Sequence, residues 1–155
     1  MINFKNDLKP NSYIAIHFRR GDYINEVQHA IAYCSNFSFI QYLSCALNLL
    51  PSEFDDFPVV ILSDDINWFK NINISRLSNL KRNFIFVHND VISDWLLINN
   101  ARLNIISNST YSYTAALLNS QNIGQKLRLI MPFWFNQDLT THAKGWHSLN
   151  GSISI

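Results

Sequence analysis

Short apolar runs typical of β-strands alternate along this chain with longer segments whose apolar residues recur at helical spacing. The strand-like runs occupy residues 13–18, 58–62, 84–87, 103–106 and 127–131. The helix-like segments occupy residues 37–50, 65–80, 92–101 and 109–118. Strands that alternate with helices pair in parallel through crossovers. The pattern therefore predicts an α/β fold, a Rossmann-like parallel sheet of about five strands with helices on both faces.

Length and composition predict a single domain and argue against binding to nucleic acid. With 155 residues, 48% of them hydrophobic, the chain can bury one core, so we expect a single domain over residues 1–155. A net charge of +1 offers no extended basic surface, so we expect no nucleic-acid partner, and an anion would have to bind at a local site. After Met131 the aromatic stretches 132–135 and 145–147 show no periodicity and predict no element.

Neither a targeting segment nor a metal site is evident in the sequence. The first residues contain no apolar signal core, and no run approaches the 18 apolar residues of a membrane span, so we expect a cytoplasmic location that still permits peripheral attachment at the inner membrane. Cys34 and Cys45, if they share one helix, lie about 16 Å apart, too far for a disulfide. The histidines outside the first strand show no ligand spacing, so we expect no metal cofactor; they are His29, His88, His142 and His147.

Three of the expected strands end in unusually polar sequence. The first is followed by the residues Arg19 to Asp22 and a polar loop that extends to Glu26, the second by Asp64 and Asp65, and the fourth by a hydroxyl-rich run over 107–112. In a Rossmann-like order the first and fourth strands are neighbours, and ligands bind where the strand order reverses. The sequence therefore predicts that these polar segments line one crevice.

The residue types in this crevice suit an anionic nucleotide. Two adjacent arginines at a strand end point to opposite sides, so one can bind a diphosphate with two parallel bonds while the other holds the loop. Gly21 permits a sharp turn, and Asp22 can pair with an arginine. The Ser109, Thr110 and Ser112 hydroxyls lie where a helix begins, and its free N–H groups and positive dipole end favour phosphate.

Purely structural interpretations of the same residues stay open. The arginines could form ion pairs with Asp22 or Asp64 that serve the fold alone. The serines could be an ordinary helix cap, and acidic residues such as Asp64 and Asp65 are favoured at helix starts in any case. His17, inside an apolar strand, could be a core histidine.

Three motifs in this order resemble the α-1,2-fucosyltransferases of glycosyltransferase family 11. They are HFRRGDY (17–23), LSDDINWFK (62–70) and IISNSTYSYTAALLN (105–119), and the resemblance extends from about Ser12 to Phe135. It implies the C-terminal, donor-binding half of a GT-B glycosyltransferase. The implied reaction transfers fucose from GDP-fucose to a galactose 2-hydroxyl of a glycan acceptor, with inversion and without a metal cofactor.

The resemblance also implies roles for individual residues. Arg19 would neutralise the β-phosphate of GDP beside His17, and Arg20 would hold the loop. Further donor-binding residues would be Asp64, Asp65, Ser109, Thr110 and Ser112. A base must accept the proton of the acceptor hydroxyl, and the candidates are Asp22 and Glu26, the two acids of the first loop.

Two departures from the family pattern shape the expected function. The third motif continues with Tyr113 and Thr114 where the family usually has tryptophans. Only 16 residues precede His17, whereas family members have an acceptor domain before this motif. We therefore expect the donor half of a fucosyltransferase, which a partner chain or a second copy would complete. The alternative is a non-catalytic or incomplete GDP-sugar-binding module.

Overall fold

The computed structural model describes residues 8–25, 36–79, 81–107, 109–123, 129–131 and 152–154, and these residues form an α/β fold. The strands are β1 (Ile14–Phe18), β2 (Val59–Ser63), β3 (Phe84–Phe86), β4 (Leu103–Ile106), β5 (Leu129–Met131) and β6 (Ser152–Ser154). Every pairing is parallel, and the spatial order is β3-β2-β1-β4-β5-β6, the order of a Rossmann sheet. The predicted fold class is confirmed, with β6 as an additional edge strand that the sequence pattern did not indicate.

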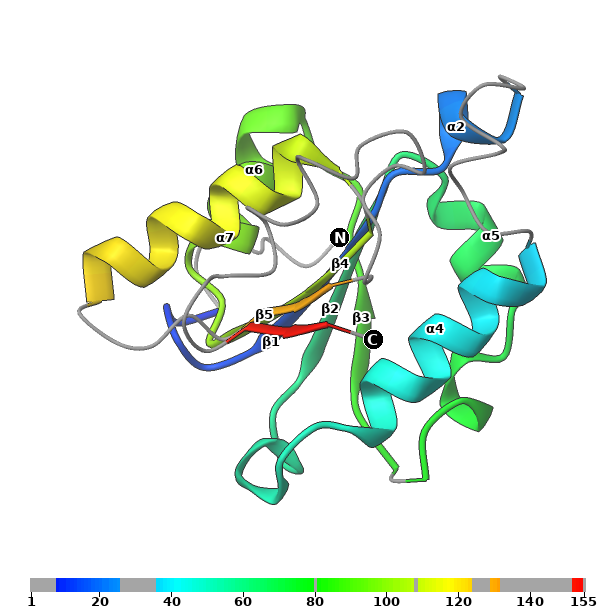
Figure 1. Cartoon of the computed structure of the whole chain (residues 1–155), viewed down its shortest axis with the longest axis horizontal. Coiled ribbons are helices and arrows are strands. Elements are labelled where there is room, and N and C mark those ends of the chain that lie inside the picture. The colour runs from blue at the N-terminus through cyan, green and yellow to red at the C-terminus, as the bar shows by residue number, and fades with distance from the viewer. Residues whose placement is uncertain are drawn as a thin grey trace.

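Helices cover both faces of the sheet, as Figure 1 shows. The α-helices are α2 (Gly21–Asn25), α4 (Asn36–Asn48), α5 (Ile66–Asn71), α6 (Val91–Asn99) and α7 (Thr110–Ile123), and 3₁₀ turns span Ser52–Phe54 (η1) and Ile74–Arg76 (η2). Helices α4 and α5 lie on one face, and α6 and α7 on the other. None of the helices in the described part of the chain is long and apolar enough to cross a membrane.

The two faces of the sheet form two separate apolar clusters, which follow from the two-residue period of a strand. In β1, Ile14, Ile16 and Phe18 face the first core, which α4 and α5 cover. Ala15 packs in the second core, against α6 and α7. Side chains of the same central strands contribute to both clusters, so the sheet separates the two cores.

Two elements differ from the sequence-based expectation. The helix expected over 65–80 ends at Asn71, because Ile72 is extended (φ −78°, ψ 138°) and only the short turn η2 follows. Alternating Asn and Ile residues have low helix propensity, and this explains the early end. The loop expected over 19–26 instead contains the one-turn helix α2. The aromatic stretches 132–135 and 145–147 lie outside the described residues, as does Cys34, and Cys45 is exposed on α4 as a free thiol.

Candidate functional site

Polar residues converge at the carboxyl ends of β1, β2 and β4, where the strand order reverses. β1 pairs with both β2 and β4. The pairing continues beyond the strands: the Ser107 N–H donates to the His17 carbonyl at 3.0 Å, and the Ser63 hydroxyl donates to the Phe18 carbonyl at 2.8 Å. The structure thus brings the three polar strand ends together at one edge of the sheet.

The Asp64 carboxylate holds the backbone that follows β1. Its Oδ1 accepts a hydrogen bond from the Arg20 N–H at 2.7 Å, and its Oδ2 accepts one from the Gly21 N–H at 3.0 Å. A Cβ atom at Gly21 would lie 3.1 Å from Asp64 Oδ2, closer than such contacts normally come. Glycine avoids this tight contact, and the carboxylate sets the start of α2.

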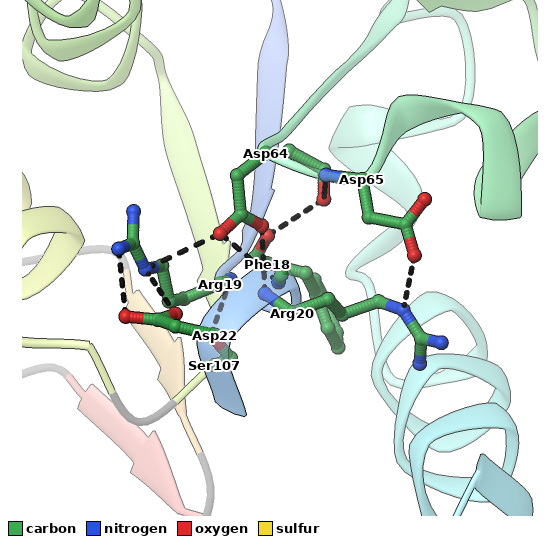
Figure 2. Close-up of polar contacts among 9 residues, drawn as sticks. Phe18, Arg19, Arg20, Asp22, Asp64, Asp65 and Ser107 are labelled. Atoms are coloured by element: carbon green, nitrogen blue, oxygen red, sulfur yellow. Dashed lines mark hydrogen bonds and ion pairs between the residues drawn. The ribbon is translucent and has the colours of Figure 1, made fainter. Parts of the chain in front are cut away.

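Arg19 lies between two carboxylates at the open edge of the site (Figure 2). Its Nε and Nη2 each donate to one oxygen of Asp22, both at 2.8 Å, and its Nε lies 3.2 Å from Asp64 Oδ2. The Arg19 N–H donates to the Ser107 hydroxyl at 3.1 Å, which fixes the backbone. The Arg19 side chain is 44% exposed, and its Nη1 points away from both carboxylates.

The paired charges reinforce each other electrostatically. The hydrogen bond to Arg19 lowers the pKa of Asp22, and the same bond, with the nearby charge of Asp64, raises the pKa of Arg19. Both groups therefore stay charged at neutral pH. An arginine with one free edge beside solvent can donate hydrogen bonds to a phosphate oxygen there.

Arg20 turns to the opposite side of the loop and is enclosed. It is 3% exposed, its guanidinium carbon lies 3.8 Å from the centroid of the Trp68 ring, and its Nε donates to Asp65 Oδ2 at 3.4 Å. Burial lowers the pKa of Arg20, while the bond to Asp65 opposes that effect. Asp65 also caps α5 by accepting from the Trp68 N–H at 3.3 Å. These contacts bind the loop to α5.

His17 is buried beside the start of α7. Its ring stacks at a tilt on Tyr111, with 5.2 Å between the centroids, and its buried Nδ1 has no hydrogen-bond partner in the part of the chain that the structure describes. Burial, and secondarily the positive charge of Arg19, lowers the pKa of His17 to about 3. The His17 imidazole is therefore neutral at physiological pH. In that state it can form hydrogen bonds without adding a positive charge to the site.

The hydroxyl-rich segment begins α7 next to the end of β1. Ser109 is buried, and its carbonyl accepts the helical bond from the Tyr113 N–H at 3.0 Å. Ser112 is also buried and donates to the same carbonyl at 3.3 Å, whereas Thr110 is exposed. The first turn of α7 therefore presents its backbone N–H groups and one accessible hydroxyl near the site.

Five of the predicted site residues thus form two networks around the loop. Arg19, Asp22 and Asp64 share one network at the open side, and Arg20 and Asp65 form a second, enclosed one. Glu26 lies outside the described residues. Among the residues that the structure describes, no group of three or more His, Cys, Asp or Glu side chains is placed to hold a metal ion.

Sequence reasoning did not assign roles to four residues that shape the site. Ser63 and Ser107 fasten the end of β1 to its two neighbours, and their signal was a serine directly after an apolar strand. Trp68 covers Arg20, and Tyr111 covers His17. A single sequence carries no signal for these two aromatic contacts, because each joins residues that lie far apart along the chain.

Comparison with known proteins places these observations in a family. Residues 1–150 match the family model described as glycosyl transferase family 11. The chain is 29% identical over 132 residues to an alpha-1,2-colitosyltransferase of Escherichia coli, a match that covers 81% of this chain and 42% of that protein. It is also 29% identical over 110 residues to the O-antigen biosynthesis glycosyltransferase WbnK of Escherichia coli, covering 68% of this chain and 34% of that protein. The chain thus spans less than half the length of these curated relatives.

Proposed function

Because the chain belongs to glycosyl transferase family 11, we propose that it binds a nucleotide-sugar donor, GDP-fucose, at the carboxyl edge of its sheet. In the complete reaction the fucosyl group would pass to the 2-hydroxyl of a galactoside glycan with inversion. The observation that carries the proposal is Arg19, which follows β1 directly at the carboxyl ends of the paired strands β1 and β4, and whose Nη1 points away from both carboxylates. Ligands of open parallel sheets bind at this point.

Stabilisation of the leaving group is the chemistry that this edge can supply. As the fucosyl carbon separates from the donor, negative charge develops on the β-phosphate. The Arg19 guanidinium and the first-turn N–H groups of α7 would stabilise that charge. Because arginine and helix-end N–H groups can take the place of a cation at a phosphate, we propose that no metal is required. Asp22 and Glu26 stay the proposed bases for the acceptor proton.

Donor binding is tested by titrating GDP into the purified chain in a calorimeter. Arg19→Ala should weaken binding by about ten- to a hundredfold, because a charge-assisted hydrogen bond to phosphate is lost. Arg76→Ala is the matched control, since Arg76 is an exposed arginine on the connection between α5 and β3, and it should bind as the parent chain does. Equal GDP affinity in the parent and Arg19→Ala proteins would refute the assignment. Loss of binding in EDTA with recovery in Mg²⁺ would refute metal independence.

Transfer is a further step of the proposal and needs an acceptor held beside the donor. Such positioning contributes roughly 7–11 kcal/mol to barrier lowering. Since the chain spans less than half the length of its relatives, we expect it to bind GDP-fucose and to transfer little fucose alone. A partner chain or second copy that supplies the acceptor side should raise the rate. Incubation with radiolabelled GDP-fucose and lactose measures this, and rapid formation of 2′-fucosyllactose by the chain alone would contradict it.

A second donor sugar is favoured by the name of one relative, the alpha-1,2-colitosyltransferase. We therefore include a colitosyl donor as the second candidate. The two candidates are separated by measuring how well each sugar nucleotide displaces bound GDP. The physiological donor should displace GDP at the lower concentration. If neither sugar nucleotide binds more tightly than GDP itself, the sugar-binding part of the proposal fails.

A further inference from the structure

Two carboxylates contact Arg19, and their surroundings differ. The Asp64 side chain is 27% exposed, accepts hydrogen bonds from two backbone N–H groups of the loop, and has its Oδ2 3.2 Å from the Arg19 Nε. The Asp22 side chain is 46% exposed, and its carboxylate accepts two parallel bonds from Nε and Nη2 of Arg19 beside the backbone N–H groups of Asp22 and Tyr23 at the start of α2. Asp64 is therefore bound to the backbone of the loop, whereas the side-chain partner of Asp22 is Arg19 itself.

The Asp22 pair has the geometry that an arginine adopts with a phosphate. Two parallel N–H···O bonds from one guanidinium edge are the preferred arrangement for both carboxylate and phosphate. In the ligand-free protein Asp22 thus occupies the edge that a diphosphate oxygen would use. If the phosphate took the free Nη1 instead, it would still share Nη2 with Asp22 and lie beside a like charge.

We propose that the two carboxylates act on donor binding in opposite directions, Asp64 as a positioning residue for Arg19 and Asp22 as an internal anion that competes with the donor's phosphate. This inference rests on the proposed function, because it takes the diphosphate of the donor to bind at Arg19. It assigns Asp22 a role in the free protein that a proton-accepting role would not require. Removing the charge of Asp22 should strengthen anion binding, and removing that of Asp64 should weaken it.

The test is a pair of isosteric substitutions, Asp22→Asn and Asp64→Asn, measured by calorimetry with GDP and with inorganic pyrophosphate. Asp22→Asn should tighten both ligands by about three- to tenfold at low ionic strength, because a neighbouring negative charge is removed. Asp64→Asn should weaken both by about tenfold or more, because its amide can no longer accept from two N–H groups and the guanidinium together.

Asp90→Asn is the matched control for a general change in net charge. Asp90 lies at the same edge of the sheet, where it caps α6, and asparagine caps helices as well as aspartate does. Its GDP affinity should stay within about twofold of the parent value, since no arginine is released. If Asp90→Asn tightens GDP as much as Asp22→Asn does, the effect is general electrostatics and the inference is overturned.

The remaining outcomes separate this inference from the proposed function. If Arg19→Ala leaves GDP binding intact, the proposed function itself fails. If Arg19→Ala abolishes binding while Asp22→Asn leaves the affinity unchanged or lowers it, only the competition fails. Far-UV circular dichroism and thermal unfolding establish that each variant is folded.

Discussion

Burial strongly changes the pKa of His17. The ring lies in the strand just before Arg19, with an unpartnered buried Nδ1 and a pKa of about 3. An ordinary histidine in the unfolded chain has a pKa near 6.5. Below that pH the unfolded chain binds a proton that the folded chain refuses, so the free energy of unfolding must fall as the pH falls from about 6.5 toward 3. The part of the free energy of unfolding that depends on a neutral His17 is therefore fully present only above about pH 6.5.

This linkage predicts the acid sensitivity of the fold. Between pH 7 and pH 5 the free energy of unfolding should drop by about 2 kcal/mol on account of His17, measured by urea titration at each pH. His17→Phe should remove most of that dependence, whereas His88→Gln, a change at an exposed histidine, should keep it. In the parent protein the His17 ring resonances should not titrate between pH 5 and pH 8. Equal pH slopes in the parent and His17→Phe proteins would contradict this account.

At the scale of elements, the sequence predicted the architecture because strand and helix periodicities are local signals. The five expected strands and their parallel order follow from apolar runs whose alternation is visible along the chain. The limits of α5 could not be predicted in the same way, since apolar Ile72 and Ile74 continue the helical pattern after the backbone has become extended. Hydrophobic spacing indicates which residues are buried, and it does not show where the helix ends.

The position of the candidate site was also predictable from the sequence, whereas its side-chain contacts were not. Topology places the ends of β1, β2 and β4 together, so Arg19, Asp64 and Ser109 could be assigned to one edge before any coordinates. Which carboxylate contacts which arginine could not, because that depends on side-chain directions over distances of a few ångström. The pairing of Arg20 with Asp65 and Trp68, and of Arg19 with Asp22 and Asp64, is information that only the folded chain supplies.

The whole molecule consists of two cores on opposite faces of one sheet, and each core contacts one described tryptophan. Trp68 packs against the first core, and Trp95 packs against the second. Since β1 contributes side chains to both cores and ends in the candidate site, we expect that neither face can unfold without disrupting the other face and that site. We therefore expect one cooperative unfolding transition for the described fold.

Single-tryptophan variants test this coupling and its link to ligand binding. In a background with Trp134→Phe and Trp146→Phe, a further Trp95→Phe or Trp68→Phe change leaves Trp68 or Trp95 as the single reporter. Within each variant, urea unfolding followed by fluorescence should coincide with unfolding followed by far-UV circular dichroism. GDP at a hundredfold excess over its dissociation constant should then add about 2.7 kcal/mol to the free energy of unfolding in both variants, because binding to an edge shared by the two cores stabilises both. A GDP effect reported by Trp68 but absent at Trp95 would show that the two faces unfold independently, and that the site depends on the α4–α5 face alone.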